Sequence, residues 1–413
     1  MPAYSGKYQY TGAAGETIGQ GPCQLSFDQE NGFVAPTGGT PIAFDLGDVD
    51  ALKRGDWDLE ATLYTGNKIV LRQFGPAFGR MADEFSAAWR DRIVRCLLLE
   101  DLEEAGRFSG SVALGDSGAQ PAEIRIYKSN VAVLPVEGAP MQWRLADVDS
   151  ISFDTAAYTV TALSEGRKLV FSKLAKKTDE FASTLQGAFD ALRLQSADAL
   201  HKTFPFLDPD RLQRLLTVMP EGRSVSLEAI GSVHSKMAPA FLARAVSPAH
   251  RPYFDALQKR ASRGPVMAGY KFIRADDDEA EEQPTDSEAS EVSNEAPTDA
   301  QAAQEESPLF FWFFFPLDRL FAWEVTTKSG RATYFFRSNA DVASLTRGLA
   351  LVNFRREPIY LPDESLEEQP RFHRYAIAAR KLPDLRTLRA AFAGRAMHST
   401  LDKWSAQVDA AKP

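Results

Sequence analysis

The sequence predicts an α+β protein in which groups of antiparallel strands are each closed by an amphipathic helix, and in which this unit is repeated. The first observation is internal repetition: residues 23–52 align with residues 122–151 without a gap, and nine of the thirty pairs are identical. Unrelated sequences of ordinary composition would share about two. The second observation is that the spacing of apolar residues changes within each copy, from a strand period to a helix period.

The strands follow from alternating apolar residues. Leu25 and Phe27 are two positions apart, as are the aligned residues of the second copy. This is the spacing of a strand with one buried face. Further along, residues 63–74 align with residues 163–174, and each segment carries a glycine between two apolar runs. That arrangement predicts a hairpin in both copies.

A helix closes each copy. Four apolar residues of the first copy correspond one for one to four of the second: Phe85, Trp89, Ile93 and Cys96 against Phe181, Leu185, Phe189 and Leu192. Steps of four, four and three residues place each set on one face of a helix. Each unit is therefore expected to be a series of antiparallel strands followed by one amphipathic helix.

This order of elements resembles the pleckstrin-homology-like (PH-like) fold, including bacterial PH and GRAM-type domains. The resemblance rests on the strand meander, on the segments LGDVDAL and LADVDSI, and on the hairpins GNKIVL and GRKLVF. It implies tandem antiparallel β-barrels, each capped by a C-terminal helix. It also implies binding of phosphoinositides through a basic first hairpin, or of peptides along a sheet edge and a helix groove.

The chain is expected to have six parts. They are an N-terminal tail over 1–22, PH-like repeat 1 over 23–103, PH-like repeat 2 over 108–198, a helical connector over 201–263, a weaker PH-like repeat 3 over 265–355, and a basic helical C-terminal tail over 356–413. Repeat 3 rests on a glycine hairpin at 324–336 and a helical stripe at 342–352. Whether it completes a barrel is left open.

An acidic insert at 275–307 interrupts repeat 3. It contains thirteen Asp or Glu and no Lys or Arg, so it is expected to be disordered. The whole chain carries −9 and the insert −13, so the remainder is slightly basic at +4. An acidic segment beside tandem PH-like domains also suggests a binder of basic proteins, a layout shared with histone chaperones.

The C-terminal tail has the opposite charge. Leu385, Leu388, Phe392 and Met397 have the spacing of a helix, and the tail around them is rich in Arg and Lys. The favoured interpretation is a solvated helix packed on the adjacent domain. The alternatives are docking of the acidic insert and binding to anionic lipid or nucleic acid.

Two sets of residues are candidate binding sites. Repeat 1 has an acidic first hairpin, so anion or lipid contact is considered only in repeat 2, through Arg125, Lys128, Lys173, Lys176 and Lys177. The second set belongs to a run of six aromatic residues at 310–315, of which Phe310, Phe311 and Trp312 are the candidate interaction surface. Burial of that run on both sides is the favoured interpretation.

No catalytic or cofactor-binding constellation is found. The five histidines show no metal-binding spacing, and no glycine-rich phosphate loop follows a strand, so neither a metal nor a cofactor is expected. Asp48 and Asp50, like their aligned counterparts, are expected at a turn or strand end. The alternative is a catalytic carboxylate pair, which requires a cleft.

These observations favour a non-enzymatic intracellular scaffold or adaptor that binds protein partners. A peripheral membrane adaptor that binds anionic lipid and an acidic-insert binder of basic proteins are the alternatives. Nucleic acid is disfavoured, and no small-molecule substrate is inferred. No apolar run spans a bilayer, the N-terminus has no apolar signal core, and the two cysteines, Cys23 and Cys96, suit a reducing compartment, so we expect a cytoplasmic protein.

Overall fold

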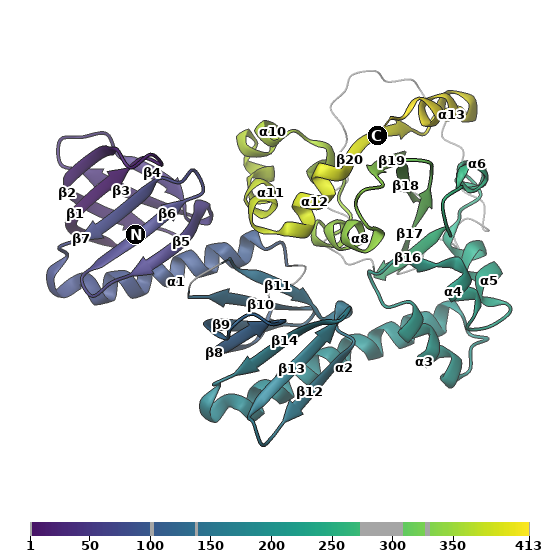
Figure 1. The fold of residues 1–413 in the computed structure, drawn as a ribbon, viewed down its shortest axis with the longest axis horizontal. Coiled ribbons are helices and arrows are strands. Elements are labelled where there is room, and N and C mark those ends of the chain that lie inside the picture. Colours follow the sequence, from purple (N-terminus) through teal and green to yellow (C-terminus); the bar gives the residue numbers. More distant parts are fainter. Residues whose placement is uncertain (1, 100–102, 137–138, 273–308, 327–330, 413) are drawn as a thin grey trace, which may run out of the picture. The chain divides into compact units, whose positions relative to one another are not determined.

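The computed structural model is of mixed α+β class, with three antiparallel sheets (Figure 1). It describes residues 2–99, 103–136, 139–272, 309–326 and 331–412. The acidic insert lies outside these residues. The chain divides into two compact units, the first of residues 1–190 with 362–383 and the second of residues 191–361 with 384–413.

Repeat 1 forms a seven-stranded sheet in the order β4-β3-β2-β1-β7-β6-β5. Its strands are β1 (Ala3–Thr11), β2 (Thr17–Phe27), β3 (Asn31–Pro36), β4 (Ile42–Asp45), β5 (Val49–Arg54), β6 (Asp58–Leu63) and β7 (Lys68–Arg72). A short 3₁₀ turn, η1 (Leu46–Asp48), precedes β5. A second turn, η2 (Gly75–Ala77), leads into helix α1 (Phe78–Cys96).

Repeat 2 has the same arrangement, in the order β11-β10-β9-β8-β14-β13-β12. Its elements are β8 (Glu104–Leu114), β9 (Gln120–Tyr127), β10 (Asn130–Pro135), β11 (Met141–Arg144), η3 (Leu145–Asp147), β12 (Ser150–Asp154), β13 (Thr159–Ser164), β14 (Arg167–Ser172), η4 (Ala175–Lys177) and α2 (Thr178–Thr203). Equivalent residues reach equivalent positions: Leu25 pairs with Val34 as Ile124 pairs with Val133. The repeated sequence is therefore a repeated strand order.

The predicted helix stripes are buried. Phe85 and Cys96 are fully buried on α1, and Phe181 and Leu185 are buried on α2. Each stripe therefore closes the core of its own sheet, as the spacing of apolar residues predicts.

The segment 1–22 is not a tail. It supplies β1 and the first half of β2, and β1 lies inside the sheet, where it pairs with both β2 and β7. Tyr4 and Tyr8 are buried, whereas the intervening residues are small or polar. The repeat alignment begins only at residue 23, so it gave no sign of this strand.

The second unit contains the connector and the third sheet. Its connector elements are α3 (Pro209–Val218), β15 (Val225–Ser226), α4 (Leu227–Gly231), α5 (Met237–Ala245) and α6 (Arg251–Arg260). The sheet runs β15-β16-β17-β18-β19-β20 in simple chain order. Its other strands are β16 (Met267–Phe272), β17 (Leu309–Pro316), β18 (Leu320–Val325), β19 (Ala332–Arg337) and β20 (Phe392–Met397).

This third sheet does not repeat the strand order of the first two. Its helix α8 (Val342–Leu351) precedes the last strand β20 instead of ending the unit. The expected repeat 3 over 265–355 therefore has the predicted first strand and helix but a different topology. The two strands of its expected glycine hairpin, β18 and β19, pair antiparallel, whereas the turn between them lies in residues 327–330, outside the described part of the chain.

The C-terminal segment is helical only in part. It contains α9 (Glu357–Tyr360), α10 (Asp363–Glu368), α11 (Pro370–Lys381), α12 (Pro383–Ala391), strand β20 and α13 (Leu401–Ala410). Leu385 and Leu388 are buried on α12 as expected. Phe392 and Met397 instead belong to β20, which pairs with β19, so the predicted helical stripe ends earlier than expected. No helix in the described residues is long and apolar enough to cross a membrane.

Candidate functional site

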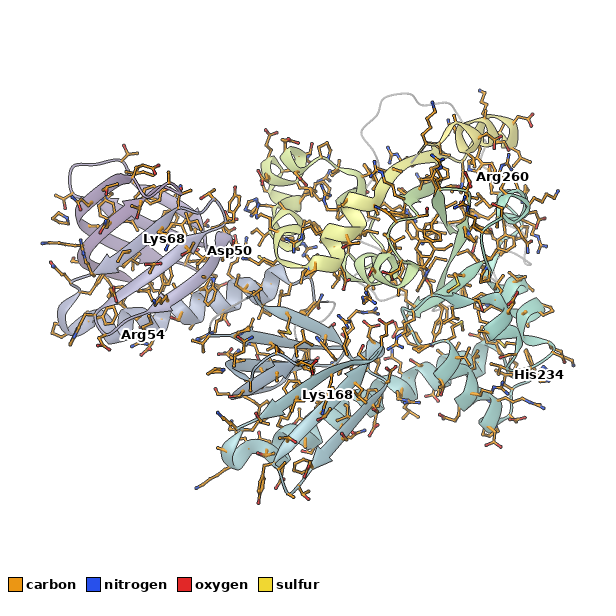
Figure 2. All side chains as sticks on the ribbon, viewed as in Figure 1. Asp50, Arg54, Lys68, Lys168, His234 and Arg260 are labelled. Atoms are coloured by element: carbon orange, nitrogen blue, oxygen red, sulfur yellow. The ribbon has the colours of Figure 1, made fainter. Side chains whose placement is uncertain are left out.

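Within the first unit, repeat 1 holds helix α11 on a surface that we call the helix-docking site. It comprises Asp45 of β4, Gly47 and Asp48 of η1, Val49 and Asp50 of β5, Tyr64 in the turn after β6, and Cys96 at the end of α1. Asp50 is labelled in Figure 2. The contacts are made between residues far apart in sequence, since Arg380 and Asp48 are 332 positions apart.

Helix α11 is locally well specified. Pro370 occupies its first turn, where the missing amide hydrogen carries no cost. The helix ends at Lys381 because Pro383 follows Leu382, and a residue before proline is pushed out of the helical region. Four consecutive residues of the helix have at most 5 % exposure: Tyr375, Ala376, Ile377 and Ala378.

Ile377 is the apolar contact of this helix with repeat 1. A Cβ built on Gly47 would lie 2.8 Å from Ile377 Cδ1 and 3.1 Å from Cys96 Sγ. The absence of a side chain at Gly47 therefore allows the helix to approach η1 closely. Ile377 and Cys96 are both fully buried at this point.

Two cations follow Ile377 on the same helix face. The Arg380 guanidinium donates to Asp48 Oδ1 and lies 3.9 Å from the centroid of the Tyr64 ring. Lys381 Nζ donates to Asp50 Oδ1 at 2.9 Å and to the Val49 carbonyl at 3.3 Å. Positions three and four residues after Ile377 share its face of the helix, so one helix presents the apolar and the basic groups together.

Two hydrogen-bond acceptors of the helix-docking site are also held by contacts within repeat 1. The Val49 carbonyl also accepts from Trp89 Nε1 at 3.1 Å, which ties the start of β5 to α1. Asp45 is held by two hydrogen bonds from Arg92, at 2.9 and 2.6 Å, and lies 3.6 Å from His373 Nε2 of α11. Contacts within repeat 1 therefore hold Asp45 and the Val49 carbonyl in place.

Burial dominates the electrostatics of the site. It raises the pKa of Asp48 above its ordinary value, and the neighbouring Arg380 opposes this shift without cancelling it. Burial also raises the pKa of the Cys96 thiol to about 12, and that of Cys23, on β2, to about 11. Both thiols are consequently protonated and poorly nucleophilic at neutral pH.

Repeat 2 does not reproduce this surface. Ala146 stands where repeat 1 has Gly47, and Arg144 stands where it has Asp45. Asp147 lies 3.7 Å from Arg144, and Asp149 accepts the Glu165 amide at 2.8 Å. The two aspartates are shared by both copies, but only repeat 1 combines them with a third acid, Asp45, and a glycine.

No protein-family model and no curated protein matches this chain. The function is therefore inferred from the geometry of its own residues.

Neither Asp48 nor Asp50 is among the residues that line a cavity of the first unit. A cavity of about 440 Å³ in the first unit is bounded by Leu52, Lys53, Arg54, Asp83, Ser86, Trp89, Arg90 and Val136. Its one carboxylate, Asp83, is paired with Arg54. Because cations of α11 engage Asp48 and Asp50, the geometry favours a structural or binding role for the pair over acid–base catalysis.

The predicted anion contacts of repeat 2 are dispersed over different elements. Arg125 on β9 is 4 % exposed, and it pairs with Asp91 at 2.7 Å and Glu123 at 2.6 Å. Lys128 pairs with Glu103. Lys177 lies 5.6 Å from the ring of a buried phenylalanine, while Lys173 and Lys176 are exposed around η4. Protein carboxylates therefore neutralise Arg125 and Lys128.

The aromatic run is core. Phe311 and Trp312 are at most 1 % exposed on β17, and Phe310 is partly buried against Phe354. Phe311 contacts Phe241 of α5 edge-on, whereas Trp312 packs on Phe354 and donates to a serine hydroxyl. Both faces of the strand are covered, in agreement with the favoured interpretation.

Sequence reasoning missed Ile377, Arg380 and Lys381. The basic charge of the tail was visible, but nothing in the sequence joined it to the acidic turn of repeat 1. One group of side chains in the described residues could hold a metal ion, namely His250, Glu324 and His398 of the second unit. These residues come from three distant segments, so no local spacing revealed them either.

Proposed function

We propose that the chain is a non-enzymatic scaffold of tandem PH-like domains whose first domain binds a basic amphipathic helix. The observation that carries the proposal is the seating of α11 on the helix-docking site. Two seven-stranded sheets, each followed by a helix, support the PH-like assignment. Helix-in-groove binding is a recurring way in which such surfaces recognise partners.

The chemistry of the site defines the partner. It accepts one aliphatic side chain beside Gly47 and two cations three and four residues later, opposite Asp48 and Asp50. A helix with this apolar–x–x–basic–basic pattern matches the site in both shape and charge. An acidic or uniformly polar helix is excluded, because it would leave the buried Asp48 without its cation.

The protein's own helix holds the site, so a partner must compete with it. An intramolecular ligand is present at a high effective concentration and lowers the apparent affinity for any free helix. Helix α11 thus occupies the helix-docking site, and a partner helix of the same chemistry displaces it. Both buried cysteines are free thiols, which supports a cytoplasmic setting for this exchange.

The test is binding of a labelled synthetic peptide, residues 362–383, to the full chain, measured by fluorescence anisotropy. In the double variant R380E/K381E the cis helix carries the wrong charge and leaves the site. The unlabelled wild-type chain should therefore bind the peptide at least about tenfold more weakly than this variant, since its own helix competes.

Two controls make the result specific. A peptide carrying the same two charge reversals should bind neither protein. R371E changes a cation of α11 that is exposed and lies over Phe372, so this variant should behave as wild type. Equal, undetectable binding of the native peptide to wild type and to R380E/K381E would contradict the proposed function.

A further inference from the structure

In the second unit, three metal-ligating side chains converge from separate elements. His250 immediately precedes α6, Glu324 lies on β18, and His398 immediately follows β20. One ligand atom of each lies within 4.8 Å of the other two. Within the described ranges of the chain, no other group of three such residues comes this close.

Glu324 directs an unsatisfied oxygen into this group. The residue is fully buried, and its Oε2 accepts a 2.5 Å hydrogen bond from Thr333. Its Oε1 lies 3.1 Å from His398 Nε2 but accepts no well-aligned hydrogen bond from the residues that the structure describes. A buried carboxylate oxygen is costly unless a cation or a donor compensates it, so the position of this atom favours a cation between the three side chains.

The surrounding residues fix the orientation of all three side chains. Ser247 Oγ lies 2.8 Å from His250 Nδ1, and the Tyr253 ring stacks on His398 with centroids 4.3 Å apart. Trp404 Nε1 donates to Thr333 at 2.9 Å, and Thr333 in turn donates to Glu324. Outer contacts of this kind are what hold imidazole and carboxylate ligands in position around a metal.

We propose that His250, Glu324 and His398 bind a divalent transition-metal ion. Two imidazole nitrogens and one carboxylate oxygen suit zinc, and also iron(II) or cobalt(II). Ligands at roughly 2.1 Å from a tetrahedral ion lie about 3.4 Å apart, close to the 3.1 Å between Glu324 Oε1 and His398 Nε2.

Burial shields the three ligand side chains from solvent. His250 is 7 % exposed, Glu324 is fully buried and the His398 side chain is 10 % exposed, so access by a substrate is narrow. The ion joins α6, β18 and the segment after β20, and so it links the C-terminal part of the chain to the core of the second unit. This inference is independent of helix binding by repeat 1.

Zinc is the probe for the test. The full chain is stripped with a chelator and dialysed against zinc. Bound metal is counted by inductively coupled plasma mass spectrometry, and affinity is measured by competition with a chromophoric chelator. Wild type should bind one zinc per chain, and its thermal midpoint should rise with zinc concentration. T333V should weaken binding by about 10–100-fold, and H398Q and E324Q should each weaken it by more than T333V does.

H201Q is the matched control, because His201 is an exposed histidine on α2 of the same unit. It should bind zinc as wild type does. If E324Q fails to fold by circular dichroism, H398Q and H250Q decide the result. Cobalt(II) absorption of the wild type, lost in H398Q, adds a readout of coordination. Absence of zinc from the wild type, or undiminished affinity in folded H398Q and H250Q, would overturn the proposal.

Discussion

At the residue scale, Gly47 sets how closely α11 approaches repeat 1. Its backbone is unstrained, so the requirement is one of space, and a methyl group there meets Ile377 Cδ1 and Cys96 Sγ. The aligned residue of repeat 2 is Ala146, which shows that the repeated turn itself accepts a side chain. The glycine of repeat 1 is therefore a property of the docking site and not of the turn.

Gly47→Ala should weaken the docking of α11 by about 1–3 kcal/mol, the usual cost of overpacking a buried contact. Hydrogen exchange measured by mass spectrometry should show faster exchange of α11 amides in this variant. The reverse change in repeat 2, Ala146→Gly, should leave α11 exchange at the wild-type rate. Unchanged α11 exchange in Gly47→Ala would show that the close contact contributes nothing.

Asp48 makes stability depend on pH. Burial raises the folded-state pKa of Asp48 above the ordinary value of 3.8. The stabilisation of the folded state by the protonated Asp48 is therefore complete below pH 3.8 and is lost as pH rises through the raised pKa. Asp48→Asn keeps an oxygen that accepts from Arg380 but cannot ionise. Relative to this variant, the wild type should lose stability as pH rises from about 4 to 7, measured as urea midpoints.

Asp116→Asn, at an exposed turn of repeat 2, is the control for that series. The difference between its urea midpoint and that of the wild type should stay constant over the same pH range. A constant difference between wild type and Asp48→Asn across the same range would mean that burial does not perturb the carboxyl.

At the element scale, a side-chain cap fixes the start of α8. Asp341 caps α8 by accepting from the Ser344 amide and from its hydroxyl, both at 2.8 Å. Burial acts to raise the pKa of Asp341, but these hydrogen bonds outweigh it and the net pKa lies below 3.8. Its stabilising effect is therefore present above pH 3.8 and is lost as pH falls through the lowered value.

Asp341→Ala should cost about 1 kcal/mol at neutral pH, and Asp341→Asn distinctly less, because Asn also caps. Thermal unfolding of both variants gives the measurement. The difference between the wild type and Asp341→Ala should shrink in acid. A cost for Asn as large as that for Ala would show that the negative charge, not the cap, is responsible.

The elements also show where sequence patterns suffice. The stripes Phe85–Cys96 and Phe181–Leu192 gave both closing helices, because four apolar residues at helical spacing have one reasonable structure. The stripe through Phe392 and Met397 failed. This segment is a strand because it pairs with the edge of β19. The local spacing of apolar residues carries no information about an edge provided by residues 332–337.

At the scale of the whole molecule, the sequence predicted two equivalent sheets but not the contacts that distinguish them. Repetition of turns and core residues was sufficient to define two equivalent sheets. The contacts that distinguish the copies join residues hundreds of positions apart, as Arg380 and Asp48 do, and no pattern within a single sequence connects them. The C-terminal segment was expected to pack on its neighbour, whereas α10 and α11 belong to the unit of repeat 1.

Alkylation of Cys96 tests the central claim most directly. Cys96 is fully buried beside Ile377, whereas Cys23 is buried on β2, takes part in none of the α11 contacts described above, and serves as an internal control in the same chain. With maleimide and mass spectrometry, both thiols should be protected in wild type and in R371E. In R380E/K381E, Cys96 should be alkylated at least about tenfold faster, while Cys23 stays protected. Equal protection of Cys96 in all three proteins, or equal acceleration at Cys23, would contradict the claim that repeat 1 reversibly binds a basic helix.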